Sequence, residues 1–321
     1  MTDEMELTEK DLTMPKSQVA IMLCTMNGQR FLSDQLESIR DQSVVDWQLW
    51  VSDDGSRDKT VAILEQFRTL CGSDRVTICL GPRRGFAANF LSLTCNTEIQ
   101  ADYYAYADQD DVWEEDKLAR ALSWLGTVPA NLPALYCSRT RLVDEYGRDI
   151  GLSPLFSKAP SFANALMQNI GGGNTMVFNR AARSLLLEAG WDLDIVTHDW
   201  WVYMLVSGCG GKVMYDPEST VRYRQHGANI VGSNVNWPAR MLRVRMLLDG
   251  RFRDWSIRNL RALQGVRHLL TPENRWRLDV WAKCRQKRLF SRLVNVYRSG
   301  IYRQTLAGNL GLLVAAVFRR L

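Results

Sequence analysis

Cysteine patterns typical of a disulfide-bonded protein are missing from this sequence of 321 residues. The seven cysteines are odd in number and form no CxxC pair. Most of them sit inside apolar runs, as Cys24, Cys79 and Cys137 do. These features argue against a disulfide framework and favour a protein of the reducing cytoplasm.

The sequence also lacks a secretory signal and a long hydrophobic run. Its start, "MTDEMELTEKDLTMPK", is acidic and polar, whereas a signal begins with basic residues and an apolar core. We therefore expect residues 1–17 to be a disordered leader. The C-terminal stretch "LAGNLGLLVAAVFRRL" is interrupted by Asn309 and is shorter than the roughly 18 apolar residues needed to span a bilayer. An interfacial position on a membrane would suit this stretch.

Charge, by contrast, is abundant and unevenly divided. The residues from Arg240 to the C-terminus include 19 Lys/Arg and 4 Asp/Glu, a net charge of +15. Residues 1–239 hold the remaining 21 basic and 31 acidic residues, a net charge of −10. This division predicts an acidic body and a basic tail that meets an anionic partner. On charge alone, that partner could be a nucleic acid or a membrane surface.

Apolar runs alternate with helical patterns along the first part of the chain. The runs are "VAIMLCT", "WQLWVSDD", "VTICL" and "YYAYAD", and an amphipathic segment follows each one. This rhythm predicts an α/β fold with a mostly parallel central sheet. Turn formers in "MNGQ", "DDGSRD" and "GPRRG" place polar residues at the carboxyl ends of the strands, where open α/β sheets bind ligands.

The pattern becomes less regular after Trp113, where short strands and helices mix. We divide the body, residues 18–235, into a first half, 18–113, and a second half, 114–235, that should shape a substrate pocket. Residues 236–321 form the basic tail, which we expect to be helical.

Three carboxylates stand where the fourth apolar run ends. Asp108 and Asp110 are separated by one residue, so both side chains can point to one side of an extended chain. Such a pair suits Mg²⁺, which completes its shell with water and phosphate oxygens, and Mn²⁺ accepts similar ligands. The site would therefore imply a phosphorylated ligand. The alternative is a solvated acidic loop, in which Asp111, Glu114 and Glu115 favour the dipole of the next helix.

A second carboxylate cluster, "VSDDGSRDKT", lies at an earlier strand end. Ser56 and Asp58 fit a local turn and a helix cap. A turn does not need two adjacent carboxylates, as Asp53 and Asp54 are. One of them could accept a hydrogen bond from the ring N–H of a nucleobase. Uracil, thymine and guanine carry such a donor, whereas adenine does not.

These segments resemble the bacterial family 2 glycosyltransferases, which have a nucleotide-binding α/β fold of the GT-A type. The resemblance spans residues 18–232 and rests on seven blocks in the family's order: "TMNGQRFLSDQLESIRDQS", "VSDDGSRDKT", "RRGFAANF", "YADQDDVWEEDKL", "GGGNTMVFNRAA", "THDWWVYMLV" and "YRQHGANIVGSN". The forms "DQDDVW", "HDWW" and "YRQHG" are similar to the branch that includes rhamnosyltransferases of surface polysaccharides and lipopolysaccharide core. Residues 18–113 would then be the nucleotide-binding half and 114–235 the acceptor half.

The resemblance implies a role for individual positions. Asp54 becomes the carboxylate that binds the base, and Asp108 to Asp110 becomes the family's DxD metal motif, with Asp110 the most direct ligand. The implied nucleotide-binding residues are Thr25, Asn27, Asp54 and Asp108. The implied ligands of Mg²⁺ or Mn²⁺ are Asp108, Asp110 and His226.

Asp199, in "THDWW", falls where the family keeps its catalytic base. A sugar hydroxyl is a poor nucleophile, and a nearby carboxylate can take its proton as it attacks the anomeric carbon. A metal would stabilise the departing nucleoside diphosphate, and attack from the opposite side inverts the anomeric centre. The alternative for Asp199 is a helix cap.

The acceptor or diphosphate region implied by the resemblance contains Gly173, Asn174, Trp200, Trp201 and Arg224. Several alternatives stay open. The tryptophans could pack in the core, and the glycine run could be a flexible loop. Arg224 could face the diphosphate together with Arg222, or both could neutralise nearby acids. The sequence departs from the family at Met26 and Cys24, which suggests weaker stacking on the base.

The sequence thus predicts an inverting, metal-dependent glycosyltransferase, with L-rhamnose from dTDP-rhamnose as donor and a lipopolysaccharide core or surface polysaccharide as acceptor. A UDP-linked donor is the alternative, ahead of a glycoside hydrolase or a non-catalytic carbohydrate-binding protein. We expect a cytoplasmic enzyme, peripheral on the inner face of the bacterial inner membrane, whose tail binds anionic lipid and not nucleic acid. The alternative for the tail is a helix packed on the body with solvated arginines.

Overall fold

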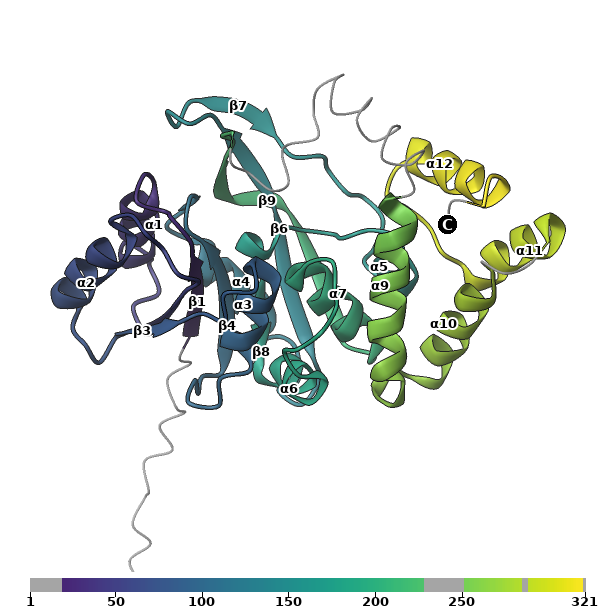
Figure 1. Ribbon diagram of the computed structural model, residues 1–321, viewed down its shortest axis with the longest axis horizontal. Coiled ribbons are helices and arrows are strands. Elements are labelled where there is room, and N and C mark those ends of the chain that lie inside the picture. Colours follow the sequence, from purple (N-terminus) through teal and green to yellow (C-terminus); the bar gives the residue numbers. More distant parts are fainter. Residues whose placement is uncertain (1–18, 228–250, 285–287, 320–321) are drawn as a thin grey trace, which may run out of the picture.

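The computed structural model describes residues 19–227, 251–284 and 288–319. Within these ranges nine strands form one sheet, in the order β3-β2-β1-β4-β8-β6-β9-β5, with β7 paired to β6 (Figure 1). The strands are β1 (Val19–Thr25), β2 (Trp47–Asp53), β3 (Val76–Leu80), β4 (Tyr103–Asp108), β5 (Val112–Trp113), β6 (Ala134–Val143), β7 (Asp149–Leu152), β8 (Val177–Asn179) and β9 (Lys212–Arg224).

The first four strands are the apolar runs that the sequence singled out. β1 lies between β2 and β4, and β2 pairs with β3, all in parallel. The second half mixes directions, because β8 runs antiparallel to β4 and β6 whereas β6 and β9 run parallel. The predicted α/β class with a mostly parallel sheet is confirmed.

Helices cover both faces of the sheet because the side chains of its central strands alternate between two hydrophobic cores. On β1, Val19, Ile21 and Leu23 face one core, and Ala20 and Met22 face the other. The first core also contains residues of α1 (Leu32–Arg40), α2 (Thr60–Cys71) and α4 (Lys117–Leu125). The second contains residues of α3 (Phe86–Thr94), α5 (Phe162–Ala165), α6 (Arg180–Ala189) and α7 (His198–Gly208).

The C-terminal region is helical, as predicted. It comprises α9 (Arg251–Gly265), α10 (Pro272–Cys284), α11 (Leu289–Ser299) and α12 (Leu306–Val317), with short 3₁₀ turns at Arg267–Leu269 and, in the body, at Gly173–Thr175. Leu263, Leu278 and Trp281 from these helices are fully or almost fully buried in the same core as α7. Among the described residues, no helix is both long enough and apolar enough to cross a membrane.

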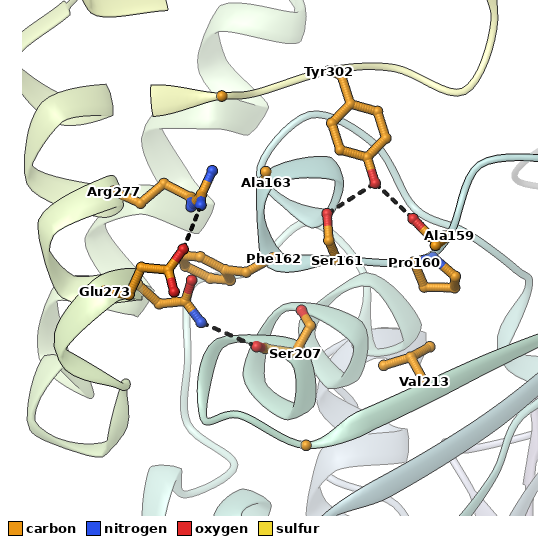
Figure 2. Close-up of a pocket in the computed structure, with 13 residues that line it drawn as sticks. Ala159, Pro160, Ser161, Phe162, Ala163, Ser207, Val213, Glu273, Arg277 and Tyr302 are labelled. Atoms are coloured by element: carbon orange, nitrogen blue, oxygen red, sulfur yellow. Dashed lines mark hydrogen bonds and ion pairs between the residues drawn. The ribbon is translucent and has the colours of Figure 1, made fainter. Parts of the chain in front are cut away.

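A pocket of about 490 Å³ marks the junction between the C-terminal helices and the body (Figure 2). On one side the Tyr302 hydroxyl lies 2.9 Å from the Ser161 hydroxyl and donates to the Ala159 carbonyl at 2.6 Å. On the other side the Asn274 side chain of α10 donates to the main-chain carbonyls of Ser207 and Gly208 in α7, at 3.2 and 3.0 Å. Side-chain contacts therefore fix the position of α10 and of the segment before α12 against α5 and α7.

All seven cysteines lie in the described ranges and all are free. The prediction that the chain has no disulfide framework is therefore confirmed.

Candidate active site

Three strand ends meet at one edge of the sheet. In the parallel register Thr25 of β1 is opposite Asp53 of β2, and Cys24 is opposite Asp108 of β4. Residues after each of these strands are therefore neighbours in space, although they come from separate parts of the chain. This is the edge at which the sequence predicted a ligand site.

Asp53 builds the turn after β2 and is itself buried. Its carboxylate accepts hydrogen bonds from the main-chain amides of Gly55 and Ser56, at 3.1 and 2.8 Å, and from two hydroxyls, those of Thr25 and Ser56, at 2.8 and 2.6 Å. The Thr25 hydroxyl is therefore directed into the sheet and is only 2% exposed. The hydroxyl of Thr25 is therefore used within the protein, and the predicted nucleotide-binding role of Thr25 stays a prediction.

Asp54 is the carboxylate of this pair that remains available. Its two oxygens accept from the main-chain amides of Arg83 at 2.6 Å and Gly85 at 3.1 Å, which hold it toward the loop after β3. A carboxylate has about four lone-pair positions, so two stay open for a ligand N–H. Gly81 allows this approach, because a Cβ atom there would lie 2.8 Å from Asp54 Oδ1.

Asn27 shapes the loop after β1. It adopts a left-handed conformation with φ of 51°. Its side-chain oxygen accepts from the Arg57 amide at 2.9 Å, and its own amide donates to the Ser56 hydroxyl at 2.8 Å. These contacts tie the loop after β1 to the loop after β2, a structural use that the predicted nucleotide role did not include.

Gln109, the middle residue of the DxD segment, joins the loops after β4 and β1. Its side-chain amide accepts from the Met26 amide at 2.8 Å and donates to the Met26 carbonyl at 3.1 Å. Gly28 makes room for it, because a Cβ atom there would lie 2.3 Å from Gln109 Oε1. Sequence reasoning missed both roles, since the contact joins positions far apart in the chain.

Asp108 and Asp110 concentrate negative charge at the same edge. Burial, followed by the charges of Asp110 and Asp199, raises the pKa of Asp108 to about 8. His226 lies beside Asp110, with Nε2 at 2.7 Å from Oδ2. The structure thus places His226 against Asp110, and Asp110 close enough to Asp108 to raise its pKa.

Asp111 is fully buried below this pair. Burial, together with the charges of Asp110 and Asp108, raises its pKa well above the ordinary value. The Asn174 side chain donates to Asp111 Oδ2 at 2.5 Å and is only 3% exposed. In this conformation the Asn174 side chain supports the acidic loop from inside, and the predicted place of Asn174 in the acceptor or diphosphate region stays a prediction.

Lys117, at the start of α4, is another buried charged residue that sequence reasoning did not single out. Its ammonium lies 4.0 Å from the centre of the Trp113 ring and has no hydrogen-bond partner within the described part of the chain. Burial lowers the pKa of Lys117 to about 7, and the charge of Asp111 opposes this effect. Nothing in the local sequence indicated that a lysine in the first turn of this helix would be completely buried.

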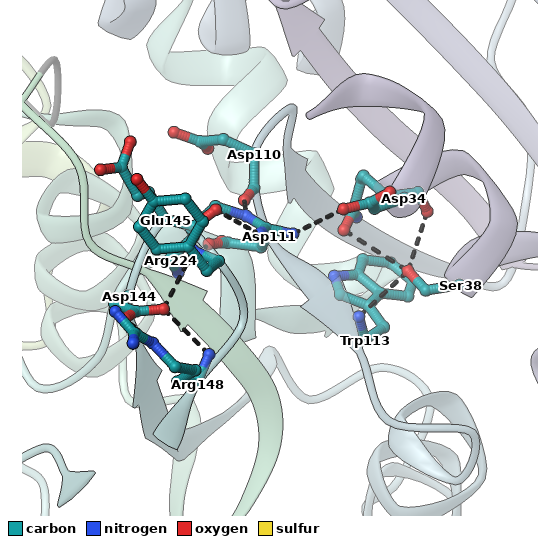
Figure 3. Close-up of polar contacts among 11 residues, drawn as sticks. Asp34, Ser38, Asp110, Asp111, Trp113, Asp144, Glu145, Arg148 and Arg224 are labelled. Carbon is teal, nitrogen blue, oxygen red and sulfur yellow. Dashed lines mark hydrogen bonds and ion pairs between the residues drawn. The ribbon is translucent and has the colours of Figure 1, made fainter. Parts of the chain in front are cut away.

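Arg224 ties the acidic loop to the rest of the body (Figure 3). Its guanidinium donates to Asp34 Oδ2 at 2.8 Å and to the main-chain carbonyls of Asp110 and Glu145, at 3.1 and 3.3 Å. Its own amide donates to Asp111 Oδ1 at 3.1 Å. In this conformation protein acceptors contact each nitrogen of the buried guanidinium, and one of them is the carboxylate of Asp34. The predicted diphosphate role of Arg224 stays a prediction.

Asp199 lies in the first turn of α7, close enough to Asp108 to raise its pKa. One carboxylate oxygen accepts from the Gly173 amide at 3.1 Å, and the other accepts from the Trp200 amide at 2.6 Å. Gly173 permits this contact, since a Cβ atom there would lie 2.4 Å from His198 Nε2. Two amide donors therefore fix the orientation of the Asp199 carboxylate.

The two tryptophans after Asp199 point away from this edge. Trp201 is fully buried, and Trp200 is 9% exposed and donates from its indole nitrogen to the Ala165 carbonyl at 2.6 Å. The ring of Trp200 also packs edge-on against Trp255 of α9, at 6.4 Å between centroids. Both tryptophans thus pack α7 against its neighbours, and their predicted place in the acceptor region stays a prediction.

No group of three or more acidic, histidine or cysteine side chains that could hold a metal ion occurs within the described ranges. The donors present nevertheless fit a hexacoordinate cation, because Mg²⁺ uses one or two carboxylates and fills its shell with water and phosphate. Burial, and then the neighbouring charges of Asp110 and Asp199, raises the pKa of Asp108, and a divalent cation beside it would oppose these effects.

The chain is similar to known glycosyltransferases in sequence and in fold. Residues 20–185 match the model of glycosyl transferase family 2. The dTDP-rhamnosyl transferase RfbG of Shigella flexneri is 28% identical over 240 residues, which cover 72% of this chain and 81% of that protein.

Two solved structures share the fold. TarS of S. aureus, in complex with UDP-GlcNAc, matches 89% of this chain and 93% of its own, with a TM-score of 0.50 and 14% identity. The mannosyltransferase PcManGT from Pyrobaculum calidifontis, in complex with GDP-Man and Mn²⁺, matches 95% and 88%, with the same TM-score and identity. Together with the sequence match over more than half of its residues, this fold shows that the chain is a glycosyltransferase that belongs to glycosyl transferase family 2.

Proposed function

We propose that the chain is an inverting, metal-dependent glycosyltransferase that transfers L-rhamnose from dTDP-rhamnose to a lipopolysaccharide core or surface polysaccharide acceptor. The observation that carries the proposal is the meeting of Asp199 with the Asp108 and Asp110 pair at the edge that also holds Asp54. Similarity to a dTDP-rhamnosyl transferase over most of the chain supports the donor.

Asp54 would recognise the base. Its oxygens are already oriented by two amides, and their open positions suit the ring N–H of thymine. Uracil carries the same donor, so a UDP-linked sugar is the alternative substrate. TarS, which shares the fold, was solved with UDP-GlcNAc. The base pocket alone therefore does not discriminate between these two donors.

Asp108, Asp110 and His226 would hold Mg²⁺ or Mn²⁺ against the diphosphate. PcManGT, which has the same fold, was solved with Mn²⁺ and GDP-Man. The cation, when bound, supplies positive charge that stabilises the diphosphate leaving group. The protein contributes a rigid acidic loop, because Gln109, Asn174 and Arg224 each hold it from a different side.

Asp199 would accept the proton of the acceptor hydroxyl as that oxygen attacks the anomeric carbon. The C–O bond to the diphosphate breaks on the opposite face, which inverts the configuration, and the proton ends on the Asp199 carboxylate. The two amide hydrogen bonds to Asp199 hold its carboxylate in one orientation for this role.

The proposed acceptor is a glycolipid or polysaccharide, and the proposed location is the cytoplasmic face of the inner membrane. The strongly basic C-terminal region supports a location at an anionic membrane surface. Nucleic acid is not a proposed partner.

Isothermal titration calorimetry with dTDP, UDP and GDP tests the donor and the metal together. We expect dTDP to bind best with Mg²⁺ or Mn²⁺ present and to bind poorly after chelation. Asp110→Ala should remove the metal-dependent part of the affinity. Preference for UDP would exclude the rhamnose donor but retain the transferase, whereas no metal-dependent binding of any nucleotide would overturn the site assignment.

Asp199→Asn tests the base separately. The amide keeps the size of the side chain but cannot accept the proton, so transfer should fall by about 10² to 10⁴. Binding of dTDP should stay close to that of the unmodified protein, because Asp199 is not proposed to touch the base. Transfer at the unmodified rate, measured as dTDP release, would show that Asp199 is not the base.

A further inference from the structure

The outer side of α12 is a continuous apolar stripe. Its exposed residues recur every three or four positions, the spacing of one helix face, and are Leu306, Leu310, Leu313, Val314 and Val317. Leu312, Ala315 and Ala316 occupy the inner face and are buried. The helix therefore has apolar residues on both sides, and within the described part of the chain only its inner side is covered by protein.

The neighbouring helix, α11, also exposes apolar side chains. Phe290, Val294 and Tyr297 are exposed, with Phe290 and Tyr297 at 80% and 86%, whereas Arg292 and Val296 on the opposite side are buried. An ordinary surface helix points its apolar side inward and its polar side outward. The two C-terminal helices depart from this rule together, at one end of the molecule (Figure 1).

Charge around the stripe has one sign. After Asp279 the sequence contains no acidic residue, and the last 42 residues include nine Lys/Arg. Arg298 and Arg319 are exposed and follow the outward-facing residues of α11 and α12. A partner for this surface must therefore offer apolar groups to the stripe and negative charge to the arginines beside it.

We propose that the α12 stripe is a docking surface for an anionic lipid bilayer, with α12 lying in the plane of the interface. Apolar side chains would enter the acyl region, and the arginines would meet lipid phosphates. The helix has 12 residues, a length of about 18 Å, which is too short to cross a hydrocarbon core of about 30 Å.

A second copy of the chain fits this surface less well. A two-fold interface places the same patch on both subunits, so two basic rims without acidic residues would face each other. Lipid phosphate offers the opposite charge. The stripe thus favours a bilayer over self-association.

This inference rests on the proposed function, in which the acceptor is held at a membrane. Its test measures binding of the protein to lipid vesicles and not sugar transfer. The full-length protein is sedimented with vesicles of phosphatidylglycerol and phosphatidylcholine, and with vesicles of phosphatidylcholine alone, without donor or acceptor. The two proposals can therefore fail independently. We expect stronger binding to the anionic vesicles and a decrease as salt is raised.

The deciding variant is Leu306→Ser/Leu310→Ser, whose side chains are 86% and 64% exposed, so folding should persist. The matched control is Val45→Ser/Leu70→Ser, with exposures of 74% and 66% on the body. The α12 variant should lose at least about tenfold in vesicle affinity, and the control should lose none. Circular dichroism and binding of dTDP check that both variants fold.

Three outcomes would overturn the inference. The protein could fail to bind either vesicle, or the α12 variant and the control could bind equally. Light scattering could instead reveal a dimer that the α12 variant disrupts in the absence of vesicle binding, which would assign the stripe to self-association. Arg298→Glu provides a further measure, because reversal of one rim charge should weaken binding to anionic vesicles more than binding to neutral ones.

Discussion

Asp108 accumulates the electrostatic effects of its neighbours. Burial and the charges of Asp110 and Asp199 raise its pKa to about 8, whereas an unfolded chain has a value of about 3.9. Between these values the folded protein binds more protons than the unfolded one. The contribution of Asp108 to folding stability is therefore complete below the lower value and is lost as the pH rises through the upper one.

The upward shift of the Asp108 pKa leads to a prediction for metal binding. A divalent cation binds the ionised form of Asp108, so below about pH 8 it must displace a proton. Affinity for Mg²⁺ in the presence of dTDP should rise with pH, by up to about tenfold per unit, and level off above pH 8. Calorimetry in two buffers with different heats of ionisation measures the released proton. An affinity that does not change with pH would show that Asp108 is not a ligand.

Gly173 is expected to be as important as the carboxylate that it contacts. In Gly173→Ala the new Cβ atom would lie 2.4 Å from His198 Nε2 and 3.4 Å from Asp199 Cβ, which displaces Asp199 from its amide donor. Transfer should fall by about 10², the typical effect of a small misplacement of a catalytic group. Binding of dTDP should persist.

Gly265→Ala is the matched control for that substitution. Gly265 ends α9, and a Cβ atom there would meet nothing within 4 Å. Its transfer rate should match that of the unmodified protein. Equal rates for the two alanine variants would show that the position of Asp199 does not depend on Gly173.

Some residue roles follow from sequence and others do not. Asp54, Asp108 and Asp110 could be assigned to one edge because strand ends of a parallel sheet converge. The roles of Arg224 and Trp200 depend on partners from distant segments, such as Asp34 and Ala165. No local pattern reveals such partners.

At the scale of elements, α11 and α12 are joined through a buried arginine. Arg292 is 2% exposed and donates to the carbonyl of Ala316 in the last turn of α12. A cation near a helix C-terminus is favourable, because it satisfies carbonyls that have no partner within the helix. The arginine thus holds α12 in place while the outer side of that helix remains exposed.

We expect Arg292→Met to loosen α12 from α11. Loss of the donor leaves buried carbonyl groups unsatisfied, at a cost of roughly 1–3 kcal/mol. Hydrogen exchange should become faster in α12, while α7 should be unchanged. Arg298→Met, an exposed change on the same helix, should leave both helices unchanged. Equal exchange in the two variants would exclude this role for Arg292.

Strands were easier to predict than the connections of the second half. β1, β3 and β4 match the predicted apolar runs residue for residue. β1 and β4 are largely buried on both sides and read as continuously hydrophobic, whereas β3 is mostly half-buried. β9 is different, since its 13 residues include exposed, acidic and proline positions. Its register with β6 shifts twice, and those irregularities depend on the partner strand.

At the scale of the whole molecule, one hydrophobic core contains described residues from both the body and the C-terminal helices. The exact boundary between body and tail remains a prediction. Leu263, Leu270, Leu278 and Trp281 belong to the cluster that contains α7. Leu270 also lies against Gly208, where an added Cβ atom would be 2.7 Å away. Sequence analysis predicted a helical tail but not this shared core, because basic residues dominate its composition.

A chain cut after Gly227 should therefore fold poorly. It would lose four large buried side chains, each of which contributes roughly 1.5–3 kcal/mol, a sum similar to the net stability of a typical domain. We expect an insoluble product, or one without a cooperative thermal transition in calorimetry. A soluble, cooperatively folding product that binds dTDP would instead show that the body is independent of α9 to α12.

The shared core also sets a geometric limit on the reaction. α7, which carries Asp199, is packed into the same rigid unit as α9 and α10, and α11 and α12 follow from that unit. On a bilayer docked by α12, Asp199 stands at a height above the lipid that the fold determines. Acceptor chains would present their terminal sugar at that height only when they have a suitable length. The enzyme would then select acceptors by the length of their chains in addition to the chemistry of their terminal sugar.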